Sequence, residues 1–325
     1  MKYNLAIVGA TGLVGRTFLK VLEEQNFPLK SIKLLASERS AGTFLNFKNE
    51  AIAVEKLEQN SFKGIDIALF SAGGSISKEW AKNANSDNCI VIDNSSYWRN
   101  FPDVPLVVPE VNPQAVQSHN GIIANPNCST IQLVLPLKAL KDDFGLKRIV
   151  VSTYQSISGA GQKGLDQLEA ERLGLGAKNP ISKHRIANNC VFHSFESGED
   201  STSEEVKMIN ETRKILDLPK LAISVTCVRV PVIGGHCESV NLELEKEFTI
   251  EEVKESLTRQ KNLIIKDNPS SDEYPTLCDA ENSDFVFVGR IRKDSSVKNG
   301  LNLWIVADNL RKGAATNAVQ IAELL

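Results

Sequence analysis

The chain has 325 residues, of which 42% are hydrophobic and 24% are charged, and its formal net charge is -3. A single hydrophobic core usually stops growing below this length, so we expect two domains. The 37 basic and 40 acidic residues nearly balance, which argues against a nucleic-acid-binding protein because such proteins carry a basic surplus.

Signals for export and for membrane insertion are not found in the sequence. The first four residues are followed by a short apolar run at 5–8, which provides neither the basic n-region nor the long h-region of a secretory signal. No apolar run approaches the ~20 residues that a membrane span needs. We therefore expect a cytoplasmic protein with no membrane partner.

Six cysteines are spread along the chain, at positions 89, 128, 190, 227, 237 and 278. None belongs to a CxxC pair, so we expect neither a zinc ribbon nor a thioredoxin-type motif, and no metal site. Disulfides are rare in a reducing compartment, and most of these thiols should be small core residues.

Short apolar runs alternate with segments of helical periodicity over the first 125 residues. We expect helices at residues 14–22 and 76–84, and strands at residues 5–8, 32–36, 65–70, 89–92 and 106–108. Strands that alternate with helices predict a parallel sheet with right-handed crossovers.

The second half has strands with period-two alternation, which predict a mostly antiparallel sheet with helices on one face. We expect helices at residues 161–173 and 203–216, and strands at residues 149–155, 223–232, 239–245, 285–292 and 301–307. Thr202 and Glu205 fit a capping box at the second of these helices. A last helix at 313–325 is expected to return to the first domain.

A glycine-rich loop, GATGLVG at residues 9–15, follows the first expected strand and opens the first expected helix. Gly9 permits a tight turn, and Gly12 lets the backbone approach a pyrophosphate at the helix N-terminus. Gly15 allows close packing of helix and strand. The GxxGxxG spacing is weak alone, but its place after a strand favours a dinucleotide site over a plain glycine-rich turn.

The end of the second expected strand bears on the choice of dinucleotide. An Asp or Glu there binds the ribose 2′-OH of NAD, whereas an Arg accommodates the 2′-phosphate of NADP. The chain offers Glu38 for NAD, and Arg39 with Ser37 and Ser40 for NADP. We favour NADP, and the alternative is that Arg39 is a solvated loop charge.

Cys128 lies in the segment Asn125-Pro126-Asn127-Cys128, directly before a buried-looking helix. Pro126 ends the preceding strand, so the thiol should lie in the first turn of that helix. The helix dipole and free backbone N–H groups favour a thiolate there, and the same N–H groups can stabilise an oxyanion. The alternative for any cysteine is a buried hydrophobic residue.

A reactive thiol needs a base, and the chain has histidines at positions 119, 184, 193 and 236. His236 follows a strand end and Gly234-Gly235, a position that presents an imidazole in a cleft. A satisfied structural histidine is the alternative. Arg229 has apolar neighbours in its strand, so it should pair with a carboxylate of the protein or of a substrate.

Seven segments carry a resemblance to one enzyme family. They are GATGLVG at 9–15, DNSSYWR at 93–99, NPNCST at 125–130, YQSISGAG at 154–161, ETRKIL at 211–216, RVPVIGGH at 229–236 and DNLRKGAATNA at 308–318. In this order, over essentially the whole chain, the sequence resembles the aspartate-β-semialdehyde dehydrogenase family. NPNCST with RVPVIGGH is highly specific, because the related N-acetyl-glutamyl-phosphate reductases share the glycine loop and a similar Cys turn but lack the second motif.

The resemblance implies an α/β fold like that of glyceraldehyde-phosphate dehydrogenase. Residues 1–127 plus 308–325 would form a Rossmann-type NADP-binding domain, and residues 128–307 an α+β catalytic and dimerisation domain. It also implies a homodimer formed through the second domain.

The resemblance further implies residue roles. Cys128 would be the nucleophile, His236 the general acid/base, and Gln155 would orient the intermediate. Arg229 would bind the substrate α-carboxylate, Glu204 its amino group, and Arg99 and Lys207 the phosphate, with Asn127 also at the substrate. The cofactor-binding residues would be Gly9, Thr11, Gly12, Leu13, Val14, Ser37, Arg39, Ser40, Ser71, Ser158, Gly159 and Asn309.

Two of these roles stay open at this stage. Glu204 and Glu205 are adjacent, so either fits the amino group, and a surface i,i+3 ion pair of Glu204 with Lys207 is the alternative. Asn309 stands where some family members carry Gln.

The implied reaction is the NADPH-dependent reduction of aspartyl-4-phosphate to aspartate-4-semialdehyde and phosphate, through a cysteine thioester. This reaction feeds lysine, methionine, threonine and isoleucine biosynthesis. The rivals are a reductase of N-acetyl-glutamyl phosphate and a dinucleotide-binding regulator without turnover, which would need the nucleophile or the base to be missing. A hydroxy-acid dehydrogenase leaves the Cys128 turn unexplained.

Overall fold

The computed structural model describes residues 2–195 and 200–325, which form two compact units. The first comprises Met1–Asn127 and Ala314–Leu325, and the second comprises Cys128–Gly313. Residues 308–313, which we assigned from the sequence to the first domain, cluster with the second unit. One cause is the ion pair of Arg311 with Asp284, at 2.8 Å. In the part of the chain that the structure describes, no helix is long and apolar enough to cross a membrane.

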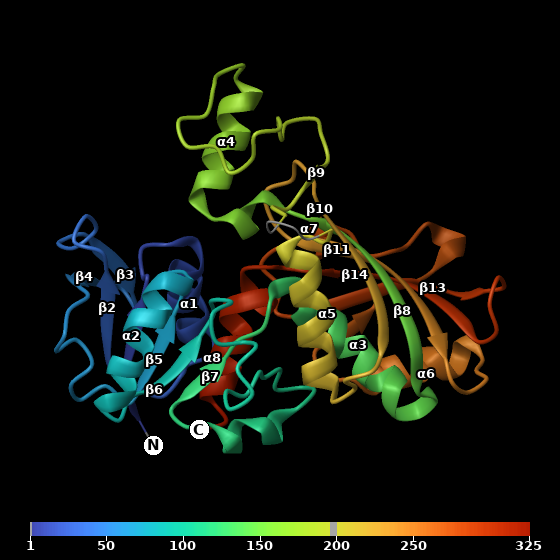
Figure 1. Ribbon diagram of the computed structural model, residues 1–325, viewed down its shortest axis with the longest axis horizontal. Coiled ribbons are helices and arrows are strands. Elements are labelled where there is room, and N and C mark those ends of the chain that lie inside the picture. The colour runs from blue at the N-terminus through green and yellow to red at the C-terminus, as the bar shows by residue number, and fades with distance from the viewer. Residues whose placement is uncertain (1, 196–199) are drawn as a thin grey trace. The chain divides into compact units, whose positions relative to one another are not determined.

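The first unit is built on a seven-stranded sheet in the order β3-β4-β2-β1-β5-β6-β7 (Figure 1). All neighbouring strands are parallel except β3 and β4. The strands are β1 Tyr3–Val8, β2 Leu29–Ala36, β3 Phe44–Phe47, β4 Glu50–Lys56, β5 Ile67–Phe70, β6 Ile90–Asp93 and β7 Ile122–Ala124. The chain runs outward from β1 in both directions, which confirms the Rossmann-type parallel sheet and puts the switch point beside the glycine loop.

Three helices belong to this unit: α1 Leu13–Glu24, α2 Gly74–Ser86 and α8 Thr316–Ala322. The first two confirm the expected helices. The C-terminal helix is shorter than expected, because residues 311–315 form a turn of π-helix before it. Ala318, Val319 and Ile321 are fully buried in the core of the first unit, so the expected return of the C-terminus is confirmed.

The strand expected at residues 106–108 is wrong. Only Leu106 forms a bridge, to Ala124, and the edge of the sheet is β7 instead. The Asn112 side chain explains the difference, because its Oδ1 accepts from the Val108 N–H and its Nδ2 donates to the Leu106 carbonyl. A side chain therefore satisfies the backbone groups that a neighbouring strand would otherwise pair with.

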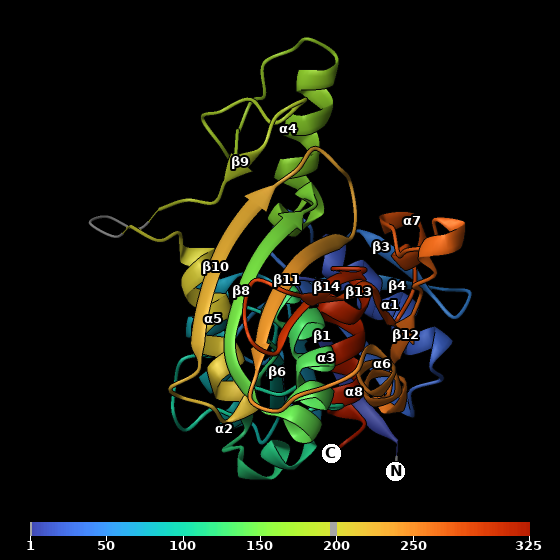
Figure 2. The same cartoon turned by 90° about the vertical axis from the view of Figure 1, so that its right-hand side faces the viewer.

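The second unit holds another seven-stranded sheet, in the order β12-β13-β14-β11-β8-β10-β9. Only β8 with β10 and β12 with β13 are parallel, so the mostly antiparallel sheet is confirmed. The strands are β8 Leu146–Gln155, β9 Val191–Phe192, β10 Ala222–Arg229, β11 His236–Leu244, β12 Leu263–Ile265, β13 Val286–Asp294 and β14 Gly300–Ala307. Helices α3 Cys128–Phe144, α5 Ser203–Leu216 and α6 Ile250–Arg259 pack on the sheet, and Figure 2 shows α3 and α5 on one side of the curved strands.

Two shorter features complete the second unit. Helix α4 Gln162–Arg172 stands away from the sheet at the end of β8 in both views (Figures 1 and 2), and α7 Leu277–Ala280 lies beside β14. The capping box of Thr202 and Glu205 at α5 is confirmed. Strand β11 begins three residues earlier than expected, at His236.

The cysteines differ in part from expectation. Cys89, Cys227 and Cys237 are buried, but Cys190 and Cys278 are exposed, so only half of the six are core residues. All six are free thiols.

Gly9 is a position in the glycine loop where both the backbone conformation and the space exclude a side chain. Its φ is +85°, and a Cβ there would lie 2.4 Å from the main-chain oxygen of Ser71 at the end of β5. We expect Gly9→Ala to lower the free energy of unfolding by several kcal/mol, measured by urea denaturation. Gly42→Ala is the matched control, because Gly42 has a φ of +83° and open space around it, so it should lose only about 1–2 kcal/mol of backbone strain. Equal losses in the two variants would contradict the steric argument.

Candidate active site

Three polar side chains lie in one row across the sheet of the second unit. Gln155 ends β8 and is the register partner of Arg229, at the end of parallel β10. On its other side, Gln155 is the partner of His236, at the start of antiparallel β11. Gln155 therefore meets, at one end of the sheet, two residues that lie 74 and 81 positions later in the sequence.

The thiol of Cys128 reaches this row from the helix layer. Cys128 is the first residue of α3, which confirms the expected position at a helix start. Its Sγ lies 3.2 Å from Nε2 of His236. The thiol is partly exposed, and the helix N-terminus favours its ionised form.

The imidazole of His236 is fully buried and bound on both sides. Its Nδ1 lies 3.0 Å from the Ser156 amide, a donor, and 3.0 Å from the Gly235 carbonyl, an acceptor. Either neutral tautomer therefore has a partner at Nδ1, and Nε2 can face Cys128 with or without a proton. Burial lowers the pKa of His236 to about 4, so the imidazole is neutral at neutral pH.

Gln155 is buried and contacts the two helices, α3 and α5, that begin at the site. Its Nε2 donates to Oγ of Ser129, at 2.8 Å, and approaches Oε1 of Glu204 at 3.4 Å. These contacts fix the amide between the first turn of α3 and the first turn of α5.

The two adjacent glutamates of α5 have different surroundings. Glu205 caps the helix through the Thr202 amide, at 2.7 Å, and also accepts from the Cys227 amide, at 3.0 Å. Glu204 instead faces Gln155 and pairs with Lys207, at 3.2 Å. The i,i+3 ion pair that was the alternative for Glu204 is thus present, although the Glu204 side chain is only 9% exposed. Of the two glutamates, Glu204 is the one that contacts Gln155.

Arg229 is half-buried and faces the same site. Its guanidinium donates to the Ser156 carbonyl, at 3.3 Å, and lies 3.4 Å from Nδ1 of His193. Burial, followed by the charge of Arg229, lowers the pKa of His193 to about 3. The histidine is therefore a neutral acceptor, and no protein carboxylate forms an ion pair with Arg229 among the described residues.

The segment that follows β8 is tied to His236 through Asn309. Asn309 Oδ1 accepts from the Gly235 amide, at 2.8 Å, and its Nδ2 donates to Ser158 Oγ, at 3.0 Å. The contacts seen for Asn309 and Ser158 thus hold the loop around His236. A Cβ on Gly159 would lie 3.5 Å from Nε2 of His236, so this glycine leaves room over the imidazole.

The other predicted site residues lie in the first unit. Arg99 is buried, and its guanidinium donates to the carbonyls of Asn94 and Asn125, both at 2.9 Å. Asn127 is buried directly before Cys128. These contacts hold the Arg99 side chain beside the residues that directly follow β6 and β7.

The glycine loop has the geometry of an anion site. Gly12 is the N-cap of α1, and no side chain caps the helix, so backbone N–H groups of Leu13 and Val14 are available at its start. Thr11 contributes its carbonyl to Arg16 Nε. Ser71 follows β5 next to this loop.

The two charged residues that follow β2, Glu38 and Arg39, differ in their ion pairing. Glu38 pairs with Lys56, at 3.0 Å, whereas Arg39 is exposed and forms no ion pair with any residue that the structure describes. Ser37 and Ser40 flank them, joined by a turn hydrogen bond of 2.9 Å. Arg39 is thus available for an anionic ligand.

Comparison with known proteins agrees with these observations. The model of the semialdehyde dehydrogenase NAD binding domain matches residues 4–119, and that of the semialdehyde dehydrogenase dimerisation domain matches residues 137–312. The aspartate-semialdehyde dehydrogenase of Aquifex aeolicus is 56% identical, over 100% of this chain and 98% of that protein. The chain belongs to the aspartate-semialdehyde dehydrogenase family.

Solved structures of the aspartate-semialdehyde dehydrogenase family extend the likeness to the fold. Aspartate semialdehyde dehydrogenase II of Vibrio cholerae, complexed with ASA, superposes with a TM-score of 0.95 at 45% identity, covering 100% of this chain and 98% of that one. The Candida albicans aspartate semialdehyde dehydrogenase with NADP gives a TM-score of 0.79 at 26% identity, over 100% and 98% of the two chains.

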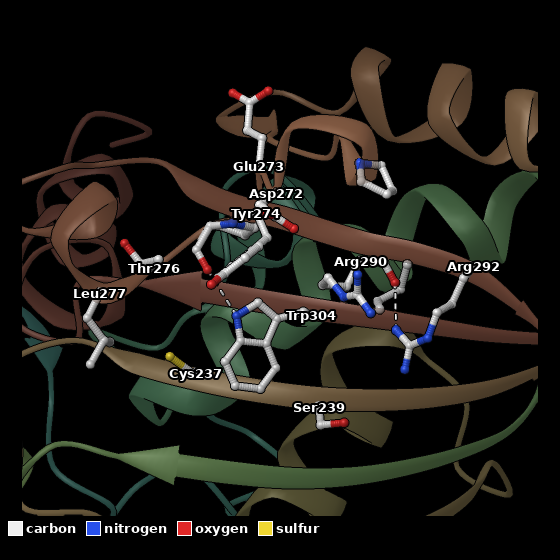
Figure 3. Close-up of a pocket in the computed structure, with 13 residues that line it drawn as sticks. Cys237, Ser239, Asp272, Glu273, Tyr274, Thr276, Leu277, Arg290, Arg292 and Trp304 are labelled. Atoms are coloured by element: carbon white, nitrogen blue, oxygen red, sulfur yellow. Dashed lines mark hydrogen bonds between the residues drawn. The ribbon is translucent and has the colours of Figure 1, made fainter.

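A pocket of about 470 Å³ lies on the opposite face of the second sheet (Figure 3). Because side chains alternate along β11, Cys237 and Ser239 face this pocket while His236 faces Cys128. Trp304 and Tyr274 also line it, and Trp304 Nε1 donates to the Pro275 carbonyl. This pocket is separate from the thiol site.

Sequence reasoning missed several residues that hold the site. Ser156 and Gly235 stand inside the quoted motifs, so their place beside Gln155 and His236 was a usable signal. Ser129 also follows Cys128 directly. His193 has no local signal, because β9 is two residues long and its approach to Arg229 depends on pairing with β10.

The burial of His236 makes a prediction about its protonation. We expect its imidazole to stay neutral as the pH falls through 6.5, the ordinary value, and to protonate only near pH 4. The measurement is a titration of the histidine Cε1 signals by NMR, with His236→Asn to assign the resonance. A midpoint near 6.5 would show that the site is more solvated than these contacts indicate.

Proposed function

We propose that this protein is an NADP-dependent, phosphorylating aspartate-β-semialdehyde dehydrogenase. In the biosynthetic direction it would convert aspartyl-4-phosphate and NADPH to aspartate-4-semialdehyde, phosphate and NADP. The product would supply lysine, methionine, threonine and isoleucine synthesis in the cytoplasm, a location consistent with six free thiols. The observation that carries the proposal is the 3.2 Å contact of Cys128 with His236 at the start of α3.

The thiol and imidazole are arranged for nucleophilic catalysis. Nε2 of His236 takes the thiol proton, and the sulfur attacks the acyl carbonyl, so a C–S bond forms and the bond to phosphate breaks. Backbone N–H groups of the first turn of α3 stabilise the oxyanion. When bound, NADPH supplies the hydride for reduction at the thioester carbon. His236 would donate its proton to the former carbonyl oxygen when that carbon is reduced. It would take the proton back as the C–S bond breaks, which forms the aldehyde and regenerates the thiolate.

The charges around the thiol match the substrate. Arg229 has no carboxylate partner in the described protein and would bind the substrate α-carboxylate through its planar fork. Glu204 would accept from the amino group, with Lys207 and Arg99 binding the phosphate. Gln155, held by Ser129, would orient the acyl group, and Asn127 would complete the binding site.

The residues of the first unit fit NADP. A Cβ at Gly9 would strike Ser71, and the uncapped start of α1 at Gly12 leaves N–H groups for a pyrophosphate. Unpaired Arg39, with Ser37 and Ser40, would hold the 2′-phosphate, while Glu38 is paired with Lys56. Thr11, Leu13 and Val14 would complete the loop contacts. Of the second unit, Ser158, Gly159 and Asn309 would contact the cofactor.

We further propose a homodimer formed through the open face of the second sheet. Tyr154 and Trp304 lie on this face, their ring centroids 5.6 Å apart, and Tyr154 is 40% exposed. Exposed aromatic side chains on an uncovered sheet face are typical of a protein interface. The match of residues 137–312 to the semialdehyde dehydrogenase dimerisation domain supports a dimer formed through the second unit.

Removal of the nucleophile tests the function. We expect Cys128→Ala to abolish phosphate-dependent NADP reduction with aspartate semialdehyde, while NADP affinity changes little. Cys278→Ala, which removes an exposed thiol, is the control and should keep wild-type turnover. Wild-type preference for N-acetyl-glutamate semialdehyde, or substantial turnover by Cys128→Ala, would contradict the proposal.

Removal of Arg39 tests the cofactor assignment. We expect Arg39→Ala to weaken NADP binding by roughly tenfold or more while NAD binding is nearly unchanged, because only NADP carries the 2′-phosphate. Binding of both dinucleotides is measured by fluorescence titration, with Lys63→Ala as an exposed-cation control. Equal loss for both cofactors would show that Arg39 does not contact the 2′-phosphate.

A further inference from the structure

A second pair of polar side chains lies directly behind the thiol and imidazole. Strand alternation puts His236 and Glu238 on the same face of β11, with Cys237 on the other. On α3, Gln132 follows Cys128 by one helical turn. The site therefore has two layers, Cys128 with His236 and then Gln132 with Glu238.

This second layer is closed to solvent. Gln132, Glu238 and the neighbouring Thr153, which is the register partner of Glu238 on β8, are all 0% exposed. Both carboxyl oxygens of Glu238 lack a hydrogen-bond partner, as do Oε1 of Gln132 and Oγ1 of Thr153. The Thr153 hydroxyl can donate or accept, the Gln132 oxygen can only accept, and Glu238 becomes a donor only when it gains a proton.

The charge balance around Glu238 favours its acid form. No basic side chain within the described residues forms an ion pair with it, and the thiols of Cys227 and Cys237, whose pKa values its charge raises, lie close to it, with the imidazole of His236 two residues away on the same face of β11. An isolated buried carboxylate costs several kcal/mol, and such a group binds a proton instead. Burial accordingly raises the pKa of Glu238 well above its ordinary value.

Gln132 connects this layer to the imidazole. The Gln132 amide lowers the pKa of Glu238, but burial raises it and is the larger cause. Nε2 of Gln132 donates to the main-chain carbonyl of His236, at 3.4 Å, whereas its Oε1 has no hydrogen-bond partner. A carboxylic acid can donate to such an oxygen, and an ionised carboxylate cannot.

We propose that Glu238 is a neutral carboxylic acid and a positioning residue, whose O–H donates to Gln132 and through it holds the main chain of His236 against Cys128. The assignment of His236 as the base rests on the proposed function, but the protonation state of Glu238 does not. The acid does not touch the substrate, and it exchanges no proton during the reaction.

An infrared measurement tests the protonation state without any assay of activity. The wild-type protein at neutral pH should show the carbonyl stretch of a protonated carboxylic acid, and Glu238→Gln should lose it. Absence of this band in the wild-type-minus-variant difference spectrum would overturn the proposal, whatever reaction the protein catalyses.

Kinetics test the positioning role. Glu238→Gln keeps a donor for Gln132 and should retain kcat and its pH profile. Glu238→Leu and Gln132→Leu should each lower kcat roughly tenfold with little change in KM. The double variant should lose no more activity than either single variant, because both substitutions interrupt the same hydrogen-bond connection from Glu238 through Gln132 to His236. Cys237→Ala, with its side chain on the opposite face, is the matched control.

Two kinetic outcomes would overturn the proposal. An inactive Glu238→Gln beside an active wild type would show that Glu238 acts as an ionised base, and additive losses in the leucine variants would show two independent roles. Either outcome overturns the proposal. If Glu238→Leu fails to fold, Gln132→Leu and the infrared spectrum still decide. An inactive wild type would contradict the proposed function and leave the infrared result standing.

Discussion

The register between β11 and β8 is the constraint on which the site depends. It places His236 beside Gln155 and, through the parallel pairing of β10, in line with Arg229. Because strand side chains alternate, a slip of one residue would turn His236 away from Cys128 and present Cys237 in its place. The buried apolar residues of β11 on the helix-covered face, such as Val240 and Leu242, hold this register.

The helices packed on the second sheet contribute positive electrostatic potential to the site. Helices α3 and α5 both begin at the row of polar side chains, so the positive ends of their dipoles lie beside the Cys128 thiol and the Gln155 amide. The cationic Arg229 and Lys207 add to this positive field. Beside the thiol stands one neutral imidazole, that of His236, which has a backbone partner for either tautomer.

Local signals predicted much of the fold and the position of Cys128 at a helix start. Apolar runs identified most buried strands, and the Asn-Pro-Asn turn predicted a helix start at Cys128. Prediction failed where a tertiary contact decided the outcome: the Asn112 side chain replaces a strand at residues 106–108, and β3 and β4 are mostly exposed and have no clear apolar run. The layer of Gln132 and Glu238 was missed because 106 positions separate residues that only the sheet brings to one helix.

Helix α3, which begins at Cys128, is buried along most of its length. It packs against α5, α6 and four strands, and 12 of its 17 residues are buried, including Pro136 in its interior. A helix buried on nearly every side exchanges its amide protons only when the surrounding core opens. Cys128 therefore starts the element least able to open on its own. On heating, the second unit should keep its thiol in place until the unit as a whole unfolds, so that inactivation and unfolding become a single event.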